Sequence, residues 1–129
     1  MLWWQPSSQE KVAAEAQRTQ RSIKQKMKNI IINGSNGMIG QLILGYCLDR
    51  NDVAKVTSIV RRKSGITHPK LVEIVHDNFL NYSSIAEHFK NQDIAFYCIG
   101  VYTGQVPKDE FRKITVDFTI AFAKTLSEN

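Results

Sequence analysis

The stretch Asn29-Ile30-Ile31-Ile32-Asn33, followed directly by Gly34-Ser35-Asn36-Gly37-Met38-Ile39-Gly40, decides the fold of this chain. Its first part is a short β-branched run that ends at a glycine, which is typical of a buried parallel strand. Beyond it, apolar residues recur at helical spacing as far as Asp49-Arg50. The stretch therefore predicts a strand, a tight glycine turn and a helix in direct succession.

Each of the three glycines has its own physical reason. Gly34 allows the tight turn out of the strand, Gly37 lets a phosphate approach the backbone, and Gly40 lets the helix pack closely on the strand. The helix N-terminus offers free N–H groups and the positive end of its dipole, and Ser35 and Asn36 can add side-chain hydrogen bonds. In this strand–loop–helix context the spacing predicts the pyrophosphate site of a Rossmann-type dinucleotide-binding domain. The predicted binding loop comprises Gly34, Ser35, Asn36, Gly37, Met38, Ile39 and Gly40.

Strand and helix patterns alternate along the rest of the chain. Further strands are expected at residues 55–60, 71–76 and 93–99, and helices at residues 82–90 and 108–126. The link 61–70 has little helical pattern and is expected to be a loop. This order predicts an α/β fold, an incomplete doubly wound parallel sheet of about four strands with flanking helices. Its ligand crevice is expected at the carboxyl ends of the strands.

The end of the second predicted strand indicates which dinucleotide is bound. An NAD site usually has Asp or Glu about twenty residues beyond the loop, to hold the ribose hydroxyls. This chain has Val60-Arg61-Arg62-Lys63 there, with no carboxylate. Guanidinium groups suit a 2′-phosphate, so we expect Arg61 and Arg62 to favour NADP over NAD. The alternative is a solvated basic turn.

Two more strand ends are expected at the same crevice. Asp77 follows the third strand, where it can accept a hydrogen bond from the adenine amino group, with Asn78 or Phe79 flanking the ring. Cys98-Ile99-Gly100 closes the fourth strand, and its glycine permits a close approach of the cofactor to the backbone. Ordinary loop chemistry is the alternative for both.

The first 27 residues differ from the rest and are expected to form a basic, helical extension to a domain at residues 28–129. Ser7 and Glu10 have the spacing of a capping box. Residues 1–28 hold six Lys or Arg against two Glu, a net +4, whereas the remainder has eleven against ten. This extension is either solvated or contacts an acidic partner, a membrane surface or nucleic acid. It lacks the apolar segment of a secretory signal.

Length and cysteines limit the class of protein. The 129 residues, 43% hydrophobic and 22% charged, suit one ordinary soluble domain but are few for a complete dinucleotide-dependent enzyme. Cys47 and Cys98 are far apart and form no Cys-x-x-Cys pair, so two free thiols in the reducing cytoplasm are expected. The histidines and cysteines have no metal-ligand spacing, and no metal site is predicted.

The glycine spacing resembles that of the extended and atypical branches of the short-chain dehydrogenase/reductase superfamily. Three further stretches share this resemblance: residues 55–63, 75–79 and 96–100. The similarity extends from Met27 to the C-terminus and is strongest to the branch of the Tat-interacting-protein oxidoreductase. It implies that the three glycines hold the pyrophosphate of NAD(P)H. It further implies that Arg61 and Arg62 favour NADPH and that Asp77 and Asn78 meet the adenine.

The same family uses a Tyr-x-x-x-Lys motif as its acid/base pair, on a helix that follows a fifth strand. No tyrosine here has a lysine four residues on, and the chain stops at Asn129, before that strand is expected. We therefore predict no catalytic residue. Three hypotheses remain: the cofactor-binding portion of an NADP(H)-dependent oxidoreductase, a non-catalytic NADP(H) sensor, or an interaction protein that uses its basic helix. The apolar edge at residues 93–99 also predicts a homodimer or a partner chain there.

Overall fold

One parallel sheet forms the centre of the computed structural model, which describes residues 4–100 and 104–129. The spatial order β3-β2-β1-β4 places the strand before the glycine loop in the interior of the sheet. This confirms the predicted Rossmann-like sheet of four parallel strands. The strands are β1 (Lys28–Asn33), β2 (Val53–Val60), β3 (Leu71–Val75) and β4 (Ile94–Tyr97).

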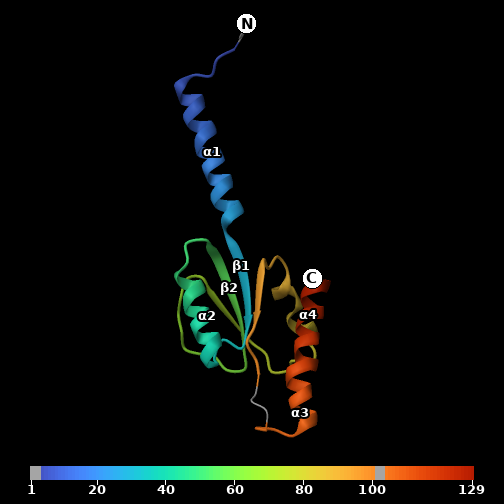
Figure 1. Cartoon of the computed structure of the whole chain (residues 1–129). Coiled ribbons are helices and arrows are strands. Elements are labelled where there is room, and N and C mark those ends of the chain that lie inside the picture. Colours follow the sequence, from blue (N-terminus) through green and yellow to red (C-terminus); the bar gives the residue numbers. More distant parts are fainter. Residues whose placement is uncertain (1–3, 101–103) are drawn as a thin grey trace.

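The helices lie on both faces of this sheet, apart from the first, which projects from the body (Figure 1). Two differ from expectation. The segment expected as a regular helix at 82–90 is a 3₁₀ helix, kinked at Ile85, and the long C-terminal helix contains one π turn. The predicted loop at 61–70 is confirmed. The helices are α1 (Ser8–Lys26), α2 (Met38–Asp49), η1 (Ser83–Phe89), α3 (Lys108–Arg112), η2 (Lys113–Asp117, the π turn) and α4 (Phe118–Glu128).

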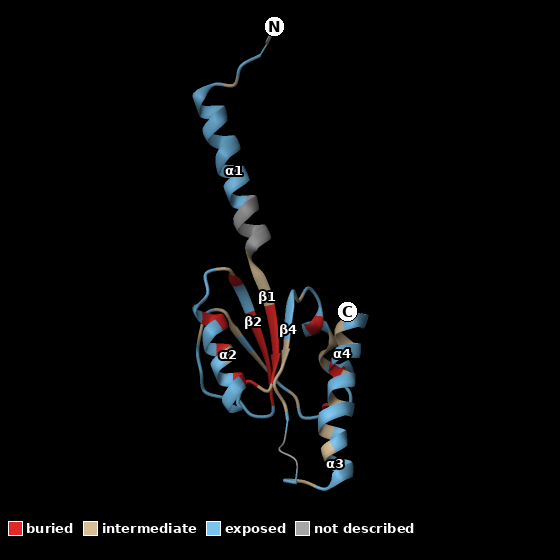
Figure 2. Ribbon diagram, in the orientation of Figure 1, coloured by how far each residue is buried: buried red, intermediate tan, exposed pale blue. Residues whose placement is uncertain are grey.

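Consecutive residues of β1 supply two separate cores, one on each face of the sheet. Ile30 and Ile32 pack toward α2, in a cluster with Leu44, while Ile31 packs toward η1 and α4, in a cluster with Phe122. Figure 2 shows the buried residues concentrated in the sheet between these layers. Because both faces are covered, the strand needs apolar residues at every position, which explains its unbroken isoleucine run.

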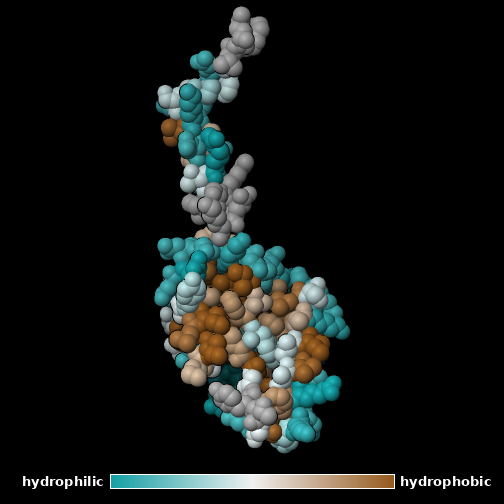
Figure 3. Space-filling view, viewed as in Figure 1, coloured by the Kyte–Doolittle hydropathy of each residue, from teal (hydrophilic) through white to brown (hydrophobic). Residues whose placement is uncertain are grey.

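The apolar residues of α2 do not all face the sheet. Leu44 and Cys47 are buried, whereas Leu42 and Tyr46 are 71% and 63% exposed. The last two line an apolar groove with Ile94 of β4. Figure 3 shows apolar side chains gathered on this side of the body. The helical spacing predicted the helix correctly but did not reveal which of its apolar residues reach the core.

The extension forms α1, which joins β1 through a single residue (Figure 1). The Glu10 amide donates to the Ser7 hydroxyl at 3.2 Å, so Ser7 caps the helix as predicted. Its residues from Ser8 to Gln20 are all exposed. Within residues 4–100 and 104–129, no helix has the length and hydropathy to cross a membrane.

Close contact between the glycine loop and α2 fixes where this helix begins. A Cβ atom on Gly40 would lie 2.0 Å from the carbonyl oxygen of Gly34. Gly34 itself has a φ of +94°, and a Cβ there would lie 2.8 Å from the carbonyl carbon of Cys98. Both positions therefore exclude any side chain, in agreement with the packing and turn roles expected for them.

The substitution Gly40→Ala should lower the free energy of unfolding by about 2 kcal/mol or more, because backbone must move to admit the methyl group. Gly45→Ala is the matched control in the same helix, since a Cβ there has no neighbour within 4 Å. It should instead raise stability by about 0.5–1 kcal/mol. Urea unfolding of both variants tests this, and equal effects would show that the close contact does not constrain the fold.

Candidate functional site

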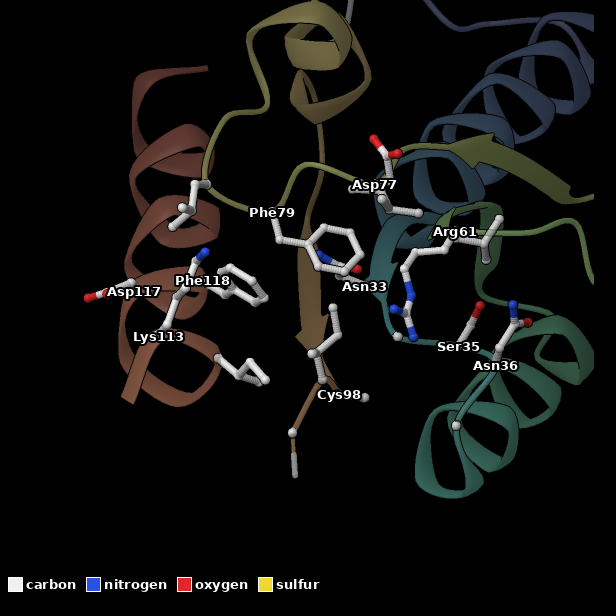
Figure 4. Close-up of a pocket in the computed structure, with 18 of the residues that line it drawn as sticks. Asn33, Ser35, Asn36, Arg61, Asp77, Phe79, Cys98, Lys113, Asp117 and Phe118 are labelled. Carbon is white, nitrogen blue, oxygen red and sulfur yellow. The ribbon is translucent and has the colours of Figure 1, made fainter. Parts of the chain in front are cut away.

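The carboxyl ends of the strands border a crevice of about 1130 Å³, at the position expected for a ligand in this fold. The glycine loop and the end of β2 form one wall, and α3 with the π turn forms the opposite wall (Figure 4). The loops after β3 and β4 contribute between them. Segments far apart in the sequence therefore meet at one site.

The glycine loop presents the N-terminus of α2 to this crevice. Gly37 is the N-cap residue, and no side chain caps the helix. A Cβ on Gly37 would make only an ordinary van der Waals contact, 3.6 Å from the Gly34 carbonyl oxygen, so this position is less crowded than Gly34 and Gly40. Uncapped N–H groups at a helix N-terminus suit an anion. Met38, Ile39 and Gly40 form the first turn of α2 and do not line the crevice.

Ser35 and Asn36 both line the crevice, but their side chains have protein partners. The Ser35 hydroxyl is buried and hydrogen-bonds the hydroxyl of Ser58 on β2. The Asn36 amide nitrogen donates to the carbonyl oxygen of Arg62 at 3.1 Å. The structure thus uses both side chains to join the loop to β2 and the turn that follows it.

The basic turn after β2 lies beside the glycine loop. Arg61 and Arg62 both line the crevice and are exposed, while Lys63 is outside it. Figure 4 shows the Arg61 side chain directed toward the loop. Within residues 4–100 and 104–129, no carboxylate pairs with either guanidinium. Both therefore remain available to an anionic ligand.

The loop after β3 brings only part of its predicted set to the site. Asp77 and Phe79 line the crevice, but Asn78 does not. The Asn78 side-chain oxygen instead accepts from the Leu80 amide at 3.1 Å, which orders the loop. Beyond β4, Cys98, Ile99 and Gly100 line the crevice together, as expected.

Sequence reasoning missed the wall made by the C-terminal helix. This wall contains Lys113, Asp117 and Phe118. The Phe118 ring packs edge-to-face on the Phe79 ring, with 5.6 Å between the ring centroids. A usable signal was the position of this helix directly after β4, because its first turns then face the crevice. The π turn falls within this wall.

Asn33, also missed, lies buried at the base of the crevice. Its amide nitrogen donates to the Tyr82 hydroxyl at 2.8 Å. Burial raises the pKa of Tyr82 above its usual range, and burial likewise raises the pKa values of Tyr97 and Cys98. All three stay protonated at neutral pH, so none is an activated base or nucleophile. Among the described residues no His, Cys, Asp and Glu cluster could hold a metal ion.

Comparison with known proteins agrees with this arrangement. Protein HTATIP2 of Rattus norvegicus is 24% identical over 110 residues, which cover 83% of this chain and 45% of the relative. The chain thus spans less than half the length of that relative.

Solved structures give the same fold. A short chain dehydrogenase from Burkholderia cenocepacia in complex with NADP has a TM-score of 0.66 and 17% identity, over 80% of this chain and 48% of its own. One from Leptospira borgpetersenii with bound NAD+ has a TM-score of 0.64 and 18% identity, over 80% and 46%.

These similarities confirm the resemblance seen in the sequence motifs. A family profile described as NAD(P)H-binding matches residues 34–126, which include the glycine loop, the arginine turn and the far wall of the crevice. The chain therefore belongs to the NAD(P)H-binding family.

Proposed function

We propose that this chain is the NADP(H)-binding portion of a short-chain-type oxidoreductase. One observation carries the proposal: two arginines that pair with no carboxylate of the described residues lie beside an uncapped helix N-terminus in a single crevice. The family match supports a nicotinamide dinucleotide. The arginines favour the phosphorylated form, because a 2′-phosphate is the group that distinguishes NADP from NAD.

In this proposal, different residues of the crevice contact different parts of the cofactor. The backbone N–H groups of the glycine loop, at the N-terminus of α2, hold the pyrophosphate. Arg61 and Arg62 hold the 2′-phosphate through charge-assisted hydrogen bonds. Asp77 accepts from the adenine amino group, and the backbone at Cys98-Ile99-Gly100 leaves room for the rest of the dinucleotide. When bound, the cofactor supplies hydride transfer.

Catalysis is assigned to groups outside the described crevice. The tyrosines and the thiol around it are held protonated by burial, and the sequence contains no Tyr-x-x-x-Lys motif. The same observation favours a second candidate function, a non-catalytic NADP(H) sensor. Both candidates share the binding site and make the same prediction for cofactor selectivity.

Titration of the chain with NADPH and NADH, followed by nicotinamide fluorescence, tests the proposal. NADPH should bind saturably and more tightly than NADH. Arg61→Ala should weaken NADPH about 10- to 100-fold and leave NADH nearly unchanged, because it removes a charged hydrogen bond to the 2′-phosphate alone.

Lys63→Ala is the matched control, since it removes the same charge from the same turn outside the crevice. It should change NADPH binding by less than about threefold. A variant without residues 1–26 should bind like the full chain, as we propose that residues 28–129 form the binding domain. Saturable binding of neither dinucleotide would refute the function, and equal losses of NADPH and NADH in Arg61→Ala would refute the 2′-phosphate assignment.

We also propose that the protein works in the cytoplasm, where Cys47 and Cys98 stay reduced.

We further propose that the protein associates with a second copy of itself through β4. This strand pairs with β1 on one side, and Ile94 is 41% exposed. An apolar edge strand with free backbone groups is a template for pairing with another chain.

Sedimentation across a range of concentrations should therefore show a reversible homodimer. Ala95→Lys, which places a charge on the exposed part of β4, should shift the chain to monomer, because a charged side chain on an edge strand opposes pairing with another chain. Ala123→Lys, the same change on the exposed side of α4, is the control and should leave the dimer intact. A wild-type chain that stays monomeric at high concentration would contradict this proposal.

A further inference from the structure

We propose that Asn36 is a positioning residue that sets the NADPH selectivity of the crevice by holding the arginine turn against the glycine loop. This inference rests on the proposed function and concerns how the two phosphate-binding parts of that site are joined. It differs from the simpler role in which the Asn36 amide contacts the pyrophosphate directly.

Side-chain hydrogen bonds join the glycine loop to the second strand and its turn, across more than twenty residues of sequence. The Asn36 amide nitrogen donates to the Arg62 carbonyl oxygen at 3.1 Å. One residue earlier, the Ser35 hydroxyl bonds that of Ser58, and both are buried. The first bond acts at the arginine turn and the second acts within the core.

Asn36 is itself fixed from the other side. The Gln41 amide nitrogen, on the first turns of α2, donates to the Asn36 carbonyl oxygen at 3.1 Å. Two hydrogen bonds thus connect α2 to Asn36, and Asn36 to the backbone of Arg62. The helix whose N-terminus would hold the pyrophosphate is therefore connected directly to the residues that would hold the 2′-phosphate.

The arginine turn has no regular secondary structure to hold it in place. Residues 61–67 are all exposed and have no helix or strand geometry. The backbone anchors on either side of the arginines are the Val60 carbonyl oxygen, which accepts from the His76 amide at 2.8 Å, and the Ser64 amide, which donates to the Glu73 carboxylate at 3.1 Å. Asn36 holds the backbone of the arginines themselves. Without the Asn36 bond, the arginines would sample more positions, and binding a 2′-phosphate would require ordering them.

This geometry predicts an effect on selectivity rather than on dinucleotide binding in general. NADH has no 2′-phosphate, so the position of the arginine turn does not contribute to its affinity. A direct contact with the pyrophosphate would instead affect both dinucleotides equally, because both carry that group. The ratio of the two affinities separates these roles.

Asn36→Ala should reduce the NADPH affinity about five- to tenfold, the effect of losing one hydrogen bond, and change the NADH affinity less than twofold. Asn36 is exposed, so this variant should fold, and any general loss of folded protein would lower both affinities alike. Asn36→Leu gives a second test, because it keeps roughly the size of the side chain, adds no charge and removes the donor N–H groups. It should also lower the ratio of NADPH to NADH affinity.

Gln41→Ala, on α2, is the control, since the Gln41 side chain bonds the Asn36 carbonyl oxygen and not the arginine turn. It should lower the ratio less than Asn36→Ala. In a background with Arg61→Ala and Arg62→Ala, Asn36→Ala should have no further effect specific to NADPH. An unchanged ratio in Asn36→Ala, or equal losses that persist in that background, would overturn the positioning role while the proposed function stands. Failure of the wild-type chain to bind either dinucleotide would overturn both.

Discussion

The close approach of three backbone segments at the glycine loop is the constraint on which the site depends. The Gly34 backbone meets the end of β4 and the start of α2 with no room for a methyl group at positions 34 or 40. This contact places the first turn of α2 directly at the carboxyl edge of the sheet. An uncapped helix N-terminus, the end of β4 and the turn after β2 then border one crevice.

Much of this architecture follows from local sequence, because β-branched runs and glycine spacing act over a few residues. The isoleucines of β1 must be buried on both faces, which requires helices on both sides of the sheet. The basic residues at the end of β2 were placed at the crevice by the topological rule for parallel sheets alone. The Arg61–Arg62 pair and Asp77 reach the crevice for this reason.

Other features depend on tertiary packing that sequence periodicity does not encode. Leu42 and Tyr46 share helical spacing with the buried residues of α2, yet they face outward, because the sheet contacts only a narrow stripe of that helix. Asn33 is the last residue of β1, directly after the isoleucine run, and its partner Tyr82 is 49 residues away. Likewise, the partners of Ser35 and Asn36 depend on how β2 aligns with β1, which is a long-range register.

Amide hydrogen exchange, measured with and without NADP+, locates the bound ligand on the backbone and so tests whether the crevice holds the dinucleotide. We expect slower exchange at the loop Gly34–Gly40 and at the turn Arg61–Arg62, with no change along α1. Saturable binding that leaves these amides unprotected, or protects another face of the molecule, would contradict this expectation.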